Sequence, residues 1–178
     1  MEKPLISDKR FWPMFWTQFL GAFNDNLFKN ALVILITFQS YSIGGIAVPQ
    51  MVALCGGIFI LPFFLFSALA GQLADRYSKS RLIFWIKVWE ILVMFIGTFG
   101  FVYKNLPILL TTLFMMGMQS SFFGPVKYSI LPHLLNDKEL ISGNAYVETG
   151  TFISVLLGTI VGGVLIAIPN SGDRKSVV

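Results

Sequence analysis

The chain has 178 residues, of which 55% are hydrophobic and only 12% are charged, and its mean hydropathy is +0.73. A soluble domain carries roughly 25% charged residues, so this composition excludes a protein whose whole surface faces water. Lys and Arg outnumber Asp and Glu by 13 to 9, but most basic residues fall between apolar runs, which argues against nucleic-acid binding. The single cysteine excludes an intrachain disulfide, and the single histidine cannot form a zinc site by itself. We expect an all-α, polytopic membrane protein without a cofactor.

Five segments are long and apolar enough to cross a membrane as helices, which takes about 20 mainly apolar residues. The expected spans are residues 11–38, 46–70, 82–103, 106–131 and 145–169. Residues 1–10 form a polar segment before the first span and lack the pattern of a cleavable signal. Residues 170–178 form a polar tail after an odd number of helices, which favours truncation of a longer protein. A genuine five-span protein is the alternative.

Basic residues between the spans predict the orientation of the chain. They cluster before the first span and between the second and third spans, whereas residues 39–45 carry no charge. The positive-inside rule therefore places the amino terminus and the loop at residues 75–81 in the cytoplasm. The loop at residues 136–140 falls on the same side, and the tail falls on the other.

Charged residues inside an apolar span cost about 2.5–3.5 kcal/mol on insertion scales, so they need a partner or a water-filled cavity. Asp25 lies near the middle of the first span, and Lys29 follows one helical turn later, so we expect these two residues to pair. Gln18 lies seven residues before Asp25 and extends the same polar stripe. The stripe predicts contacts to a substrate or ion along a central path; an ion pair that only packs helices is the alternative.

The third span carries two further charges, Lys87 and Glu90, at a spacing that allows a local pair. Lys87 is only six residues beyond Arg81, so its long side chain is expected to reach the cytoplasmic headgroups. Glu90 is deeper in the span, and its position is equally compatible with structural pairing and with a cavity role.

The fourth and fifth spans add Lys127 and Glu148. Lys127 follows Gly124-Pro125, which can bend or end a helix, and an ending helix would leave the ammonium at the membrane interface. Glu148 is expected to open the fifth span, where the helix dipole favours a carboxylate. Gly158 and Gly162 form a G-x-x-x-G pair that predicts close packing against another helix.

The loop between the second and third spans has the sequence GQLADRYSKSR at residues 71–81. Its pattern, G-x-x-x-D-R-x-x-[RK]-x-[RK], resembles the signature cytoplasmic loop of the major facilitator superfamily, although Tyr77-Ser78 stands where most members have a glycine in the second position. The resemblance implies that the loop latches two halves of a transporter in one state. A charged turn that only sets the topology is the alternative. The expected gating residues are Gly71, Asp75, Arg76, Lys79 and Arg81, together with Glu148.

Two further stretches resemble bacterial lysophospholipid transporters of that superfamily. They are QFLGAFNDN at residues 18–26, and FGPVKY at residues 123–128 followed by Gly143-Asn144-Ala145 and Glu148. The resemblance covers the amino-terminal half of a family member. It implies that lysophospholipid, chiefly lysophosphatidylethanolamine, is flipped across the bacterial inner membrane for reacylation. The expected substrate-binding residues are Gln18, Asp25, Asn26, Lys29, Glu90 and Lys127.

The resemblance also implies partners: the lipid bilayer, the substrate, a carboxy-terminal transporter half, and a fused or neighbouring acyltransferase. Two rival functions stay open, namely another major-facilitator porter and the non-transporting membrane region of an acyltransferase. No constellation of catalytic residues predicts an enzyme. His133 and Asp137 are spaced one residue too closely for the H-x-x-x-x-D motif of glycerolipid acyltransferases.

Overall fold

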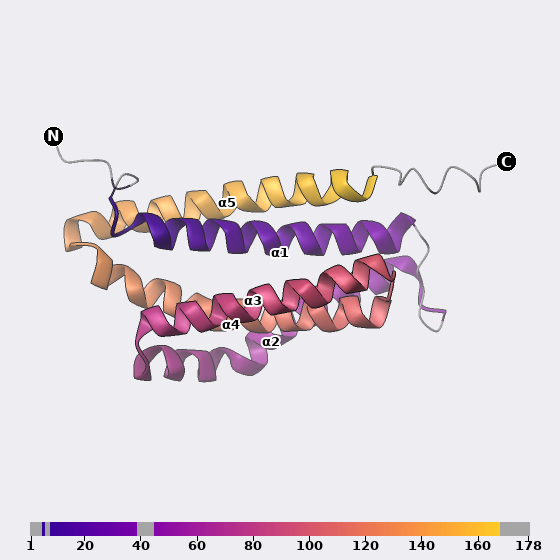
Figure 1. The fold of residues 1–178 in the computed structure, drawn as a ribbon, viewed down its shortest axis with the longest axis horizontal. Coiled ribbons are helices and arrows are strands. Elements are labelled where there is room, and N and C mark those ends of the chain that lie inside the picture. The colour runs from indigo at the N-terminus through magenta and orange to yellow at the C-terminus, as the bar shows by residue number, and fades with distance from the viewer. Residues whose placement is uncertain (1–4, 6–7, 39–44, 168–178) are drawn as a thin grey trace.

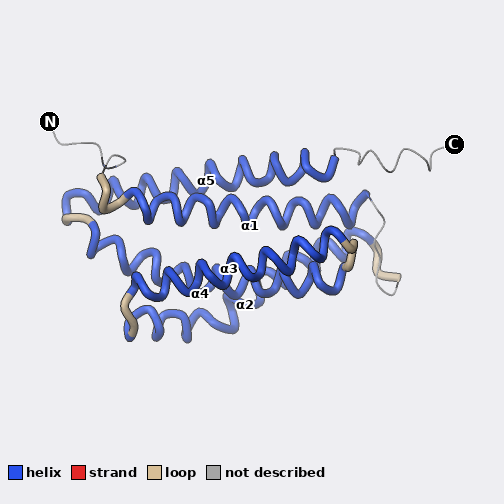
Figure 2. Tube along the Cα trace, viewed as in Figure 1, coloured by secondary structure: helices blue, strands red, loops and turns tan. Residues whose placement is uncertain are grey.

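A computed structural model describes residue 5 and residues 8–38 and 45–167 as a bundle of long helices (Figure 1). The described residues contain five helices and no strand (Figure 2). The all-α membrane bundle expected from the sequence is confirmed. Parts of the expected amino-terminal segment (residues 1–4, 6 and 7), residues 39–44 of the uncharged loop and the tail at residues 170–178 lie outside the described residues. The helices are α1 (Trp12–Phe38), α2 (Val48–Arg76), α3 (Lys79–Val102), α4 (Leu106–Leu134) and α5 (Asp137–Ala167).

The last two helices are longer than the sequence suggested. Helix α4 continues through Pro125 to Leu134, because neighbouring helices and local adjustments can compensate for the backbone hydrogen bond that a proline removes in a membrane helix. Helix α5 begins at Asp137 and not near residue 145. The backbone N–H of Asn136 donates a 2.9 Å hydrogen bond to Glu139 Oε2, and both acidic residues of the first turn favour a helix start there.

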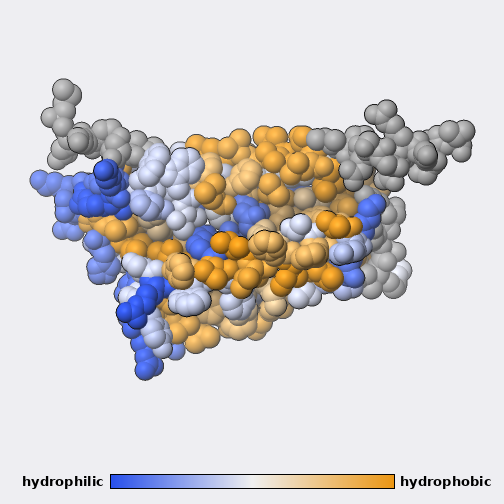
Figure 3. Space-filling view, in the orientation of Figure 1, coloured by the Kyte–Doolittle hydropathy of each residue, from blue (hydrophilic) through white to orange (hydrophobic). Residues whose placement is uncertain are grey.

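The helices pack in two groups that share one core. Helix α1 lies along α5, whereas α2 and α3 both pack on α4 (Figure 1). Buried side chains of α1, α2 and α4, among them Leu32, Met51 and Leu113, form the main hydrophobic cluster. Large apolar side chains also cover the outer faces, for example Phe64, which is 85% exposed (Figure 3). Helices of 24–31 residues with such surfaces identify a multi-pass membrane protein.

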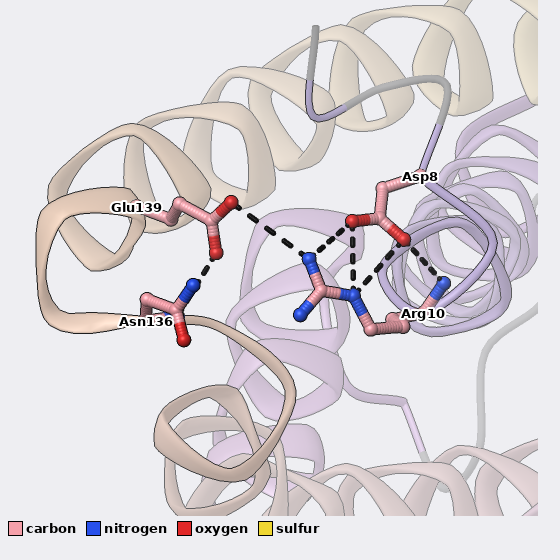
Figure 4. A network of polar contacts seen from close by, with 4 residues as sticks. All are labelled: Asp8, Arg10, Asn136 and Glu139. Carbon is pink, nitrogen blue, oxygen red and sulfur yellow. Dashed lines mark hydrogen bonds and ion pairs between the residues drawn. The ribbon is translucent and has the colours of Figure 1, made fainter. Parts of the chain in front are cut away.

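Hydrophilic side chains gather at the end of the bundle that holds the start of α1, the α2–α3 turn and the α4–α5 turn (Figure 3). Figure 4 shows how Arg10 connects two of these segments: its guanidinium is paired with Asp8 and lies 3.8 Å from Glu139 Oε1. The hydrogen bonds from Arg10 to Asp8 raise the pKa of the Arg10 guanidinium. These contacts are exposed, so they mark the polar end of the bundle and add little to its stability.

The contact between α1 and α5 depends on two glycines of α5. A Cβ atom at Gly158 would lie 2.5 Å from the carbonyl oxygen of Phe23, and one at Gly162 would lie 2.5 Å from that of Leu27. Neither distance is sterically possible without a shift of the backbone. The close-packing role expected of the G-x-x-x-G pair is confirmed.

Gly162→Ala is therefore predicted to lower the apparent melting temperature of the purified protein in detergent. Overpacking costs about 1–3 kcal/mol, which outweighs the roughly 1 kcal/mol of helix propensity that alanine adds. Gly56→Ala is the matched control, since a Cβ at Gly56 would have no neighbour within 4 Å among the residues that the structure describes. A Gly162→Ala protein that melts no lower than the Gly56→Ala protein would contradict the packing role.

Candidate functional site

Asp25 occupies the middle of α1 and faces α4. Its Oδ2 accepts a 2.6 Å hydrogen bond from the Ser120 hydroxyl, while its Oδ1 is buried and has no hydrogen-bond partner among the described residues. The expected ion pair with Lys29 is wrong. The Lys29 ammonium instead lies 4.3 Å from the centre of the Phe59 ring of α2, a cation–π contact that partly compensates for its burial. One oxygen of Asp25 is thus left available for another cation or donor.

The pair on α3 forms as expected, but Lys87 does not reach the headgroups. Its Nζ lies 2.6 Å from Glu90 Oε2, and the side chain is directed into the bundle. Glu90 also accepts hydrogen bonds from Gln119 Nε2 at 3.0 Å and from Asn24 Nδ2 at 3.3 Å. The expectation that Lys87 snorkels is wrong because this carboxylate supplies a nearby counter-ion. The network joins α1, α3 and α4.

Lys127 also lies inside the bundle. Helix α4 continues past Pro125, so the Lys127 side chain is only 10% exposed. The sequence alone favoured an ammonium at the membrane interface. Its Nζ is 3.7 Å from Glu148 Oε1, which accepts a 2.7 Å hydrogen bond from the Tyr128 hydroxyl. Glu148 lies well inside α5, so the expected stabilisation by a first-turn helix dipole is also wrong.

Gln18 of the predicted stripe and Asn26, which follows Asp25, are both bonded away from α4. Gln18 Nε2 donates a 2.9 Å hydrogen bond to Thr151 Oγ1. Asn26 Nδ2 donates to the carbonyl oxygen of Ala22 in its own helix, and its Cβ packs at Gly158. The polar side chains of α1 therefore face two different helices, with Asp25 on the α4 side and Asn26 on the α5 side.

A cavity of about 190 Å³ between α1, α3 and α4 brings several of these side chains together. It includes the predicted residues Gln18, Asp25 and Lys127, whereas Asn26, Lys29 and Glu90 do not line it. Sequence analysis placed Lys87 at the headgroups and did not single out Gln119 or Ser120, yet all three line the cavity. The sequence did indicate Gln119 and Ser120, since the polar run Gln119-Ser120-Ser121 interrupts an apolar span.

A larger hollow of about 540 Å³ lies on the other side of Lys87, between α1 and α3. Its polar residues are Thr17, Asn24, Lys87, Glu90 and Thr98, and the rest of its lining is mainly apolar. Figure 3 shows hydrophilic atoms recessed among apolar ones in the middle of this face. Lys87 thus separates a small polar cavity from a wider groove.

The α2–α3 turn lies at the polar end of the bundle, away from the cavity (Figure 1). Asp75 and Arg76 are exposed, and their side chains form no hydrogen bond or ion pair with the part of the chain that the structure describes. A Cβ at Gly71 would meet no described atom within 4 Å, so no described helix packs closely against this glycine. The gating role of the turn, including Lys79 and Arg81, stays a prediction.

A membrane bundle with charged side chains around a central cavity has the architecture of a solute transporter, and comparison with known proteins identifies the family. The model of the Major Facilitator Superfamily matches residues 14–170, so the chain belongs to that superfamily. It is 32% identical over 148 residues to the lysophospholipid transporter LplT of Escherichia coli strain SE11 and, equally, to LplT of Cronobacter sakazakii.

These matches cover 83% of this chain but 34% of each relative, so the chain spans about a third of the length of the curated relatives it matches. No solved structure matches the chain significantly. The recognition of the superfamily and of lysophospholipid transporters from the sequence motifs is confirmed.

Proposed function

We propose that this protein moves lysophospholipid, chiefly lysophosphatidylethanolamine, across the bacterial inner membrane by alternating access. Membership of the superfamily and the similarity to lysophospholipid transporters support the class of function. The observation that carries the proposal is the cavity in which the unpaired oxygen of Asp25 and the ammonium of Lys127 share one small space.

The chemistry of this cavity complements a zwitterionic headgroup. A phosphoethanolamine group carries one anionic phosphate diester and one ammonium. Asp25 Oδ1 is free to accept hydrogen bonds from the ammonium, and Lys127 can donate charge-assisted hydrogen bonds to the phosphate. Gln18 and Ser120 add uncharged polar groups to the wall. The headgroup would thereby exchange its water shell for fixed protein partners in the middle of the membrane.

The size of the cavity agrees with a site that binds the headgroup and not the acyl chain. Sites that enclose a drug-sized ligand measure about 300–1,000 Å³, and this cavity is smaller, at about 190 Å³. It suits a headgroup and excludes a whole lipid. The acyl chain would then lie along the apolar, Phe-rich helix faces or in the bilayer, where it stays in an apolar environment.

Alternating access requires that the same residues face each side of the membrane in turn. In this proposal the α2–α3 turn, with Gly71, Asp75, Arg76, Lys79 and Arg81, forms contacts in one state and releases them in the other. Glu148 would take part through its contacts with Lys127 and Tyr128. Glu90 holds Lys87 on the α3 side of the cavity. Asn26 and Lys29 would reach substrate only after α1 moves against α5 and α2.

We further propose that the polar end of the bundle faces the cytoplasm and that the flipped lipid is passed to an acyltransferase there. Single cysteines at Ser78 and Asn105, in a protein whose buried Cys55 is replaced by Ala, test the orientation. A membrane-impermeant maleimide added to spheroplasts should label the cysteine at 105 and leave the one at 78 unlabelled until the membrane is opened. The reverse pattern would contradict the orientation.

Asp25→Ala is predicted to abolish uptake of lysophosphatidylethanolamine into membrane vesicles without reducing membrane insertion, because it removes the only carboxylate that lines the described cavity. The uptake assay uses the full-length protein. Asn30→Ala is the matched control: Asn30 is on the same helix, but its amide donates to Thr159 of α5 and does not line the cavity. Normal uptake by an inserted Asp25→Ala protein would refute the role of Asp25.

A further inference from the structure

Lys87 occupies a position that its counter-ion alone does not explain. Its ammonium lies 2.6 Å from Glu90 Oε2 of α3 and 4.5 Å from the centre of the Phe123 ring of α4. On its third side is α1, where a Cβ at Gly21 would lie 2.5 Å from Lys87 Nζ. The ammonium is therefore held between three helices, and the absence of a side chain at residue 21 makes room for it.

That position places Lys87 on the wall of the cavity that Asp25 and Lys127 also line. Two ammonium groups and one carboxylate therefore surround a space of about 190 Å³. An ammonium has three N–H donors. Glu90 accepts one from Lys87, and Glu148 lies 3.7 Å from Lys127 Nζ, which is too long for a strong hydrogen bond. Both cations thus retain donors for a further acceptor.

We propose that Lys87 is a second phosphate-binding residue, which acts together with Lys127 on the two non-bridging oxygens of the lysophospholipid phosphate. This inference rests on the proposed function and adds a residue to its site. A phosphate diester presents two equivalent anionic oxygens, and one ammonium can approach each of them from the α3 side and the α4 side. Glu90 and its donors Gln119 and Asn24 hold the Lys87 side chain in place.

The placement of Gly21 supports the same assignment. Gly21 and Lys87 line both the cavity and the wider groove between α1 and α3. A methyl group at residue 21 would occupy the space next to the ammonium and force it away from α1. Two different substitutions, one that removes the charge and one that displaces it, should therefore weaken binding of the same chemical group.

The test measures lysophosphatidylethanolamine uptake by vesicles that contain the whole protein, with apparent KM expressed as mole fraction of lipid. Lys87→Gln should raise KM roughly 10- to 100-fold, the effect of losing one hydrogen bond to a charged group, with a smaller effect on kcat. Gly21→Ala should raise KM in the same direction with the charge intact. Lys104→Gln, which removes a positive charge from the exposed α3–α4 turn, should leave KM unchanged.

A purely structural role for Lys87 makes a different prediction. If Lys87 only neutralises Glu90, the double substitution Lys87→Gln/Glu90→Gln removes the pair together and should restore a normal KM. The double variant also serves if Lys87→Gln fails to fold, because it leaves no unpaired buried charge. A raised KM in the folded double variant supports the proposal, and a normal KM overturns it. Absence of lysophospholipid uptake by the unaltered protein would overturn the proposed function and this inference together.

Discussion

The structure depends on one constraint: charged side chains in an apolar bundle must find partners inside it. Lys87 pairs with Glu90, Lys127 lies near Glu148, and Lys29 contacts an aromatic ring. The first contact lies within α3, the second joins α4 to α5, and the third joins α1 to α2. Asp25 is the exception, because its Oδ1 is buried without a hydrogen-bond partner in the part of the chain that the structure describes. In a membrane protein such an exception indicates a site that a ligand completes.

Close helix packing makes this arrangement possible. Lipid offers little hydrophobic driving force between membrane helices, so association depends on contact between backbones and on interhelical hydrogen bonds. Glycines of α5 bring α1 within backbone contact, and the hydrogen bond from Gln18 to Thr151 crosses the same interface. Helix α1 is thereby fixed on one side by α5, which directs Asp25 toward α4 on the other side. The glycine at residue 21 then admits the Lys87 ammonium from α3.

The sequence was sufficient to predict five membrane helices and the superfamily, because length, hydropathy and the loop motif are local properties. Partners were harder to predict, because they depend on which helices touch. The spacing of Asp25 and Lys29 allowed an ion pair, but Ser120 and Phe59 on other helices provided better-placed contacts. Local rules also misplaced Lys127, since Pro125 was compatible with either a bend or an end and only the surrounding helices decided between them.

The central claim is that a lysophospholipid headgroup enters the cavity between α1 and α4. Ser120→Cys, in a protein whose Cys55 is replaced by Ala, places a thiol next to Asp25 on the cavity wall. Its rate of reaction with a small maleimide in membrane vesicles is the direct measurement. We predict that lysophosphatidylethanolamine slows the reaction. A rate that is the same with and without the lysophospholipid would contradict the account.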